Sequence, residues 1–292
     1  MTYSAVPTPV SGISLQEYMQ DMAGVDLTDE ESVFETAGAL AGLATDHRLL
    51  TRAMNDQLSD WANFQRANRY SATSLILDSG DGYFVRANVW LPVASEVDSH
   101  QLEDSVSSYE IPHDHNFTFL TVGYIGPGYR TRIWEYDPST VIGLPGEHVD
   151  LTFLEETHLE PGKVMLYRAS RDVHTQARPE ALSVSLNLMI SDQEKLKRDQ
   201  FYFDTDKGLL DGTVLSDNTG RLLMCDLAGL VGDDETLSLL DSLAEGHPAD
   251  RVRWHATEAA AQLHPDAAGP RLERALRDES RLVRASAAAA TR

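Results

Sequence analysis

The chain has 292 residues, 42% of them hydrophobic, and a formal net charge of -22, so it can form one large domain with additional parts or two domains. The acidic excess repels phosphate backbones, which excludes nucleic acid as an expected partner. Cys225 is the only cysteine, so an internal disulfide is excluded, and no apolar run is long enough to span a bilayer. Because MTYSAVPTPVSG also lacks a signal-peptide pattern, we expect a cytoplasmic protein without a membrane partner.

Helical signals dominate the first 69 residues. Ser14 with Glu17, and Thr28 with Glu31, have the spacing of capping boxes at helix N-termini. A third helix is predicted after Asp46, where apolar residues recur at helical spacing. We expect region 1–69 to pack on one face of the following domain.

Residues 70–192 instead show a β pattern. A hairpin is predicted with its turn at residues 79–82, because Gly-Asp-Gly supplies positive φ angles. In the second hairpin strand, Arg86 shares a face with Trp90: it is a candidate anion ligand if that face lines a barrel, and a solvated charge if it faces water. Further strands are predicted at 117–125, 129–136, 150–159, 163–167 and 182–190, with Gly and Pro in the turns. The pattern indicates a mainly β protein with α-helices, built on an antiparallel jelly-roll barrel.

The C-terminal part changes to helix again. Residues 193–232 are interpreted as a connecting segment, and residues 233–292 as helical. Within them VRWHATEAAAQL at Val252 and VRASAAAATR at Val283 repeat with a spacing of 31 residues, which resembles HEAT-type helical repeats. Such repeats are mostly interaction surfaces, so a homodimer or a protein partner is expected through this arm.

The strongest chemical signal is His113 and His115, two residues apart at the start of an apolar β-rich run. A strand projects alternate residues to one face, so both imidazoles can bind one divalent metal. His174 is the favoured third ligand, because it follows a turn and a strand that return the chain to the first pair. Alternative third ligands remain open: His148, His158, Glu147 and Glu135.

These residues also resemble a known family. HDH followed by an apolar strand ending in Val-Gly, the later histidine, and the segment ALSVSLNLMISD are similar to the cupin superfamily, and within it to the cysteine dioxygenase family. The resemblance runs from about residue 70 to residue 192. It implies that His113, His115 and His174 bind Fe(II), and that the protein inserts oxygen from O2 without 2-oxoglutarate.

The chain departs from that family behind the metal site. Members that act on cysteine carry a Ser, His, Tyr trio, and the matching positions here are Ser185, Asn187 and Met189, so free cysteine is not the expected substrate. We predict catalytic roles for Tyr124, Ser185 and Asn187. Tyr124 shares a face with Leu120 and Val122 and is expected to reach the metal cavity. Substrate binding is predicted for Arg86, Trp134 and Met189, with Arg130, Arg132 and Arg168 as alternative carboxylate ligands.

The leading functional hypothesis is a three-histidine Fe(II) oxygenase that acts with O2 on a small organic acid, amino acid or thiol. Because imidazole suits several metals, one alternative is a cupin isomerase, decarboxylase or hydrolase that uses another ion. A second alternative is a ligand-sensing cupin whose helical repeats recruit a protein partner.

Overall fold

The computed structural model describes residues 3–66, 68, 73–92, 108–191, 197–215 and 217–292. The chain divides into two compact units: unit 1 comprises residues 1–138 and 150–196, and unit 2 comprises residues 139–149 and 197–292. The predicted domain limits at residues 70 and 192 lie outside the described residues. Residues 139–149, between two barrel strands, belong to unit 2.

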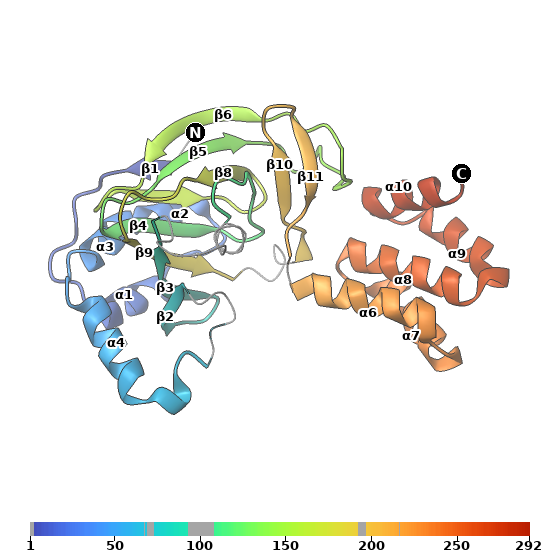
Figure 1. The fold of residues 1–292 in the computed structure, drawn as a ribbon, viewed down its shortest axis with the longest axis horizontal. Coiled ribbons are helices and arrows are strands. Elements are labelled where there is room, and N and C mark those ends of the chain that lie inside the picture. The colour runs from blue at the N-terminus through green and yellow to red at the C-terminus, as the bar shows by residue number, and fades with distance from the viewer. Residues whose placement is uncertain (1–2, 67, 69–72, 93–107, 192–196, 216) are drawn as a thin grey trace. The chain divides into compact units, whose positions relative to one another are not determined.

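Unit 1 contains two antiparallel sheets, stacked as Figure 1 shows. The larger sheet has the order β1-β7-β4-β9-β3-β2, and the smaller has the order β6-β5-β8. Their bounds are β1 Tyr3–Ala5, β2 Ser74–Ser79, β3 Tyr83–Trp90, β4 Phe119–Ile125, β5 Arg130–Glu135, β6 Thr152–His158, β7 Val164–Tyr167, β8 Asp172–Gln176 and β9 Ser183–Ile190. The expected mainly β fold with an antiparallel barrel and flanking helices is confirmed.

The side chains of the larger sheet alternate between two apolar cores. On β9, Leu186 and Leu188 pack toward the N-terminal helices, whereas Met189 packs between the two sheets. Ile133 of β5 joins the second core from the opposite sheet. Residues on this second face of β3, β4, β7 and β9 therefore line the barrel interior.

Four helices of unit 1 cover the other face of the larger sheet: α1 Leu15–Met22, α2 Glu30–Glu35, α3 Ala37–Leu43 and α4 Leu49–Ser59. The capping box of Ser14 and Glu17 is confirmed, with both reciprocal hydrogen bonds present. The second predicted box is wrong. Asp29 caps α2 instead, because its carboxylate accepts from two backbone N–H groups while the Thr28 hydroxyl donates to Asp26.

The hairpin of β2 and β3 is confirmed, and Gly82 in its turn has a φ of 78°. Two strands of unit 1 were not expected from the sequence. β1 adds to the edge of the larger sheet beside β7, and β8, with the sequence DVHTQ, pairs with β5. The second of these carries His174.

The described residues of unit 2 form a hairpin, five α-helices and a short 3-10 helix at Pro265–Ala267. The bounds are β10 Phe201–Asp204, β11 Leu209–Thr213, α6 Asp217–Val231, α7 Asp234–Gly246, α8 Asp250–Leu263, α9 Ala268–Ala275 and α10 Arg281–Ala290. Residues 193–232, interpreted from sequence as a connection, thus include both strands of the hairpin and α6. A core of small residues and leucines, including Cys225, lies between α6, α7 and α8. In the described part of the chain, no helix combines the length and the apolar character needed to cross a membrane.

Candidate metal centre

Two chain segments far apart in sequence bring three imidazoles together. His113 and His174 form an isolated antiparallel bridge, in which each backbone N–H donates to the carbonyl of the other residue, at 3.0 and 2.9 Å. Directly opposed residues of an antiparallel pair project to the same face. The bridge therefore places these two rings side by side, with centroids 4.6 Å apart.

Two hydrogen bonds hold the segment that carries His113 and His115. Asp114 is fully buried and accepts a 2.7 Å hydrogen bond from the Tyr136 hydroxyl. The His115 carbonyl accepts a 2.6 Å hydrogen bond from the backbone N–H of Ser170, which has a φ of 52°. The HDH segment precedes β4 and lies outside any named strand, so these contacts, rather than a continuous ladder, fix its two imidazoles.

The three ring nitrogens converge on one point. One ligand nitrogen from each of His113, His115 and His174 lies within 4.8 Å of the other two. His115 Nε2 is 3.1 Å from His174 Nε2, and His113 Nδ1 is 2.8 Å from the carbonyl oxygen of Ile111. Because a carbonyl only accepts, His113 Nδ1 must carry the proton, which leaves the lone pair of Nε2 available for a metal.

Burial favours the neutral form of these rings. Desolvation lowers the pKa of His113, against the opposing effect of its hydrogen bond to Ile111. Desolvation also lowers the pKa of His174 well below its usual value, and His113 and His115 lower it further. Neutral imidazoles are the form that binds a metal, so the donor set suits a divalent ion such as iron or zinc.

Three aromatic rings pack against the histidines. Phe117 stacks on His115 with ring centroids 4.6 Å apart, and Phe119 meets the same imidazole edge-on. The Tyr167 ring lies 4.5 Å from that of His174 and stacks on Phe119. These contacts hold the imidazoles in place and exclude water from one side of the cluster.

A row of polar residues crosses the larger sheet next to these aromatic rings. Arg86 of β3 is registered opposite Asn187 of β9, which is registered opposite Thr121 of β4. The Thr121 hydroxyl donates a 2.6 Å hydrogen bond to Asn187 Oδ1. Since Phe84 and Trp90 on the same face of β3 pack in the inter-sheet core, Arg86 lines the barrel interior rather than facing water.

The three predicted residues of β9 lie at different distances from the histidines. Met189 is registered opposite Phe119, which contacts His115. At about 3.3 Å per residue, Asn187 lies roughly 7 Å and Ser185 roughly 13 Å further along the strand. The Ser185 hydroxyl accepts a 3.0 Å hydrogen bond from Trp90 Nε1.

Two predicted site residues lie on the wrong face of their strands. The Tyr124 hydroxyl donates a 2.7 Å hydrogen bond to the Asp46 carbonyl, and its ring packs with the N-terminal helices. Trp134 is registered opposite Val173, so it lies on the face of the smaller sheet opposite to His174, against Phe153. Neither side chain can reach the metal cluster, and both predictions are corrected.

Among the described residues, none of the alternative third ligands belongs to the cluster. Glu135 binds Arg168 at 2.9 Å, and Glu147 accepts from three backbone N–H groups of its own turn. His158 is exposed at the end of β6, and His148 bridges to Leu209 within unit 2.

The alternative carboxylate ligands are also unsuitable. Arg168 is buried in ion pairs with Glu135 and Asp172, and both Arg130 and Arg132 lie on the outer face of β5 beside Glu156.

One interior carboxylate, Glu155 of β6, was not predicted. It is registered opposite Ile133, which is registered opposite His174 on the other side. Its Oε1 is buried without a hydrogen-bond partner, and its charge acts on the buried Tyr167. The bulge between Ile133 and Trp134 inverts the alternation of β6, so a simple period of two does not identify this residue.

The family model for HEAT repeats matches residues 208–292. No curated protein matched the sequence. Among solved structures, a DMSP lyase structure is 14% identical over 45% of this chain and 52% of its own, with a TM-score of 0.27. Hydroquinone 1,2-dioxygenase from Sphingomonas sp. TTNP3 with 4-hydroxybenzoate bound is 10% identical over 44% and 71% of the two chains, with a TM-score of 0.28. A DMSP lyase from Ruegeria pomeroyi DSS-3 is 13% identical over 64% and 78%, with a TM-score of 0.26.

The chain spans about half the length of the first of these structures. At such identities and TM-scores, none of the three transfers a reaction or a substrate to this protein. The HEAT-type helices agree with the repeat expected from the sequence, and they cover less than a third of the chain.

Proposed function

We propose that unit 1 is a non-haem Fe(II) oxygenase of the three-histidine type, which uses O2 to oxidise a small organic acid, amino acid or thiol other than free cysteine. The observation that carries this proposal is the convergence of His113, His115 and His174 within 4.8 Å, together with the burial of His113 and His174, which favours their neutral form. Three neutral nitrogen donors leave the full positive charge of the ion uncompensated. An anionic substrate is therefore favoured.

The bound ion would supply open coordination positions for the substrate and for dioxygen, which is the redox chemistry that side chains lack. Side chains of the barrel would bind and orient the substrate. Arg86 is the interior cation of the polar row, and we assign it to the substrate carboxylate, with the Asn187 amide beside it. Phe117, Phe119 and Met189 form the apolar surface against which the rest of the substrate packs.

The test combines metal content with O2 consumption. Protein purified without chelator should contain iron in a ratio near one per chain, and O2 uptake should appear with one class among small acids, amino acids and thiols. His174→Ala should lose both the iron and the O2 uptake. The matched control is His158→Ala, an exposed histidine of the same barrel. Unchanged O2 uptake in His174→Ala would overturn the assignment.

Glu155 favours a second candidate, a metal-dependent lyase or isomerase. Glu155 lies in the same cross-strand row as His174, with Ile133 between them, and its buried Oε1 could accept a proton from a substrate that the metal polarises; such a reaction needs no oxidant. Turnover in strict anaerobiosis would identify this alternative. If turnover requires O2 and Glu155→Gln retains more than half of the rate, the oxygenase is supported instead.

A further inference from the structure

Helix α6 in unit 2 is apolar on both of its sides. Its inner side contributes Leu222, Cys225 and Ala228 to the helical core. Its outer side carries a stripe of large apolar residues that are 50 to 73% exposed: Leu223, Met224, Leu227, Leu230 and Val231. We call these five residues the α6 stripe. Contiguous exposed apolar patches on soluble proteins usually mark an interaction surface, and this is the expected role of the stripe.

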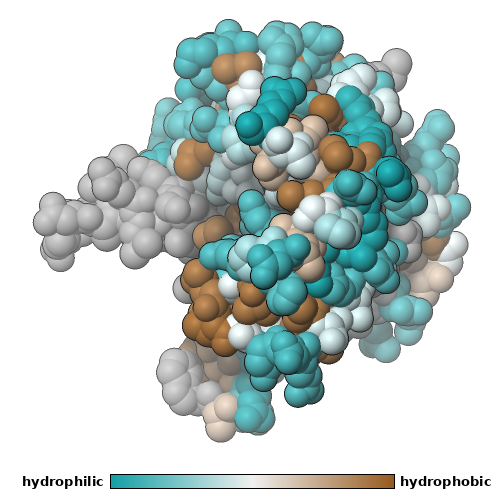
Figure 2. All heavy atoms as spheres, turned by 90° about the vertical axis from the view of Figure 1, so that its right-hand side faces the viewer, coloured by the Kyte–Doolittle hydropathy of each residue, from teal (hydrophilic) through white to brown (hydrophobic). Residues whose placement is uncertain are grey.

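The position of α6 in the helical array makes this exposure unusual. The HEAT match begins at residue 208, so α6 is the first helix of the array, and α8 packs on its inner side. The terminal helices of such arrays normally carry a polar outer face, which keeps them soluble. Figure 2 shows hydrophobic residues gathered in the lower half of the face that the C-terminal helices present.

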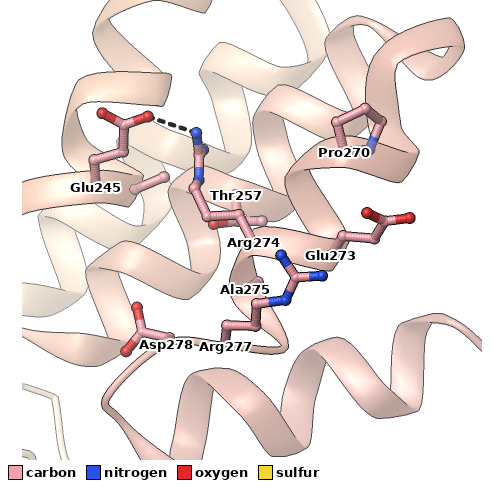
Figure 3. Close-up of a pocket in the computed structure, with 9 residues that line it drawn as sticks. Glu245, Thr257, Pro270, Glu273, Arg274, Ala275, Arg277 and Asp278 are labelled. Atoms are coloured by element: carbon pink, nitrogen blue, oxygen red, sulfur yellow. Dashed lines mark hydrogen bonds and ion pairs between the residues drawn. The ribbon is translucent and has the colours of Figure 1, made fainter.

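The groove between α7, α8 and α9 differs from the stripe in its chemistry. Figure 3 shows Arg274 paired with Glu245 across it, and Arg271 binds Asp241 at 2.7 Å nearby. Its charges are thus largely compensated within the chain. The stripe has no such internal partner among the described residues, so it is the stronger candidate for an interface.

We propose that the α6 stripe is the twofold interface of a homodimer, in which two copies of α6 pack antiparallel about Leu227. In this arrangement Met224 of one copy faces Leu230 of the other, and Leu223 faces Val231. The same register places Arg221 near the exposed Asp233 and Asp234 of the second copy. Because twofold symmetry repeats each contact, this pair of unlike charges flanks the apolar contact at both ends.

The available area is sufficient for this arrangement. Five large side chains that are each at least half exposed present on the order of 500 Å² of apolar surface per copy. Complete burial of both stripes would remove roughly 1,000 Å² from solvent, which is about the smallest area expected of a biological interface. A second copy of the chain can therefore account for the stripe without any other partner.

The proposal is tested on the full chain by light scattering coupled to size-exclusion chromatography over a range of concentrations. The wild type should elute with twice the mass of one chain. Leu227→Glu should halve that mass and raise the dimer dissociation constant by at least 100-fold, with unchanged circular dichroism. The matched control is Leu58→Glu on α4, which is 61% exposed and should remain dimeric.

Three further variants test the register and the symmetry of the dimer. Arg221→Glu should weaken the dimer, and adding Asp234→Arg should restore it, because the exchanged charges again face each other. Leu227→Cys, at the twofold axis, should form a disulfide-linked dimer on oxidation. A monomeric wild type, a dimer that survives Leu227→Glu, or a stripe protected by unit 1 of the same chain would each overturn the proposal. The metal content of unit 1 should not change in any of these variants.

Discussion

His115 Nε2 lies 3.1 Å from His174 Nε2, although the two residues are 59 positions apart in the sequence. Two nitrogen ligands of one ion, each about 2.1 Å from it, stand roughly 3 Å apart. The backbone bridge between His113 and His174 and the turn at Ser170 hold the segments that carry these rings. The spacing of the nitrogens thus fits a shared metal ion.

Metal binding should stabilise the fold measurably. Ferrous iron under argon, or Zn²⁺ in air, should raise the free energy of unfolding by about 4 kcal/mol at a free concentration 1,000-fold above the dissociation constant. His115→Ala should abolish this increase, and the exposed His158→Ala should retain it. The measurement is chemical unfolding with and without the ion. An undiminished effect in His115→Ala would place the ion elsewhere.

The metal-free protein should lose stability as the pH falls. Burial lowers the folded pKa of His113 and His174 below the ordinary value of 6.5, so the unfolded chain binds more protons in this range. Their contribution is complete above the unfolded pKa and is lost as the pH falls from about 7 toward the folded pKa values. The slope should reach about 1.4 kcal/mol per pH unit for each histidine. Urea unfolding at several pH values, compared with His174→Asn, measures it.

Tyr124→Phe should leave metal content and turnover unchanged. Its hydroxyl binds the Asp46 carbonyl on the helical side of the larger sheet, so the change should cost only about 1 kcal/mol of stability. Thermal unfolding and turnover of the variant check both statements. A tenfold loss of turnover with intact folding would show that Tyr124 acts in the active site.

The error at Tyr124 shows what residue patterns can and cannot decide. The apolar alternation of β4 and β9 predicted both strands, and the HxH motif with His174 predicted the cluster that forms. Alternation alone does not tell which face of a strand meets the barrel interior and which meets the helices. Tyr124 was placed on the interior face for this reason, although Leu120 and Val122 beside it pack against the helices.

Two other features depend on contacts distant in sequence. The five residues of β8 are mostly polar and were not predicted as a strand, because their burial comes from pairing with β5 rather than from their own composition. Glu155 was missed because a bulge reverses the face on which it lies. Such effects arise from the tertiary structure, and a single sequence carries no local signal for them.

Arg168 should be essential for the fold rather than for substrate binding. Its Nε donates to Asp172 at 3.0 Å and its Nη2 to Glu135 at 2.9 Å, with only 5% of its side chain exposed. Burial raises the pKa of Asp172 even against the opposing effect of Arg168. Arg168→Leu should therefore cost about 3–5 kcal/mol, because an uncompensated carboxylate remains buried.

The control for this prediction is Arg171→Leu. Arg171 is half exposed and lies 3.7 Å from Glu135, so its loss should cost less than about 1 kcal/mol. Urea unfolding of both variants gives the comparison. Equal costs would contradict the assignment of Arg168 as the central charge of the network.

Glu155→Leu should stabilise the fold, and its effect on turnover distinguishes the two proposed reactions. Its buried Oε1 has no hydrogen-bond partner, and an unsatisfied buried acceptor costs about 1–3 kcal/mol. Glu155→Leu should therefore raise the free energy of unfolding by about 1 kcal/mol or more, since Leu154 and Ile133 beside it already pack in the inter-sheet core. Metal content should be unchanged, because Glu155 is not among the clustered ligands.

If Glu155 accepts a proton during turnover, Glu155→Leu and Glu155→Gln should both lower kcat at least 100-fold with little effect on KM. A destabilised Glu155→Leu protein with normal kcat would show instead that the carboxylate is satisfied in solution and has a structural role.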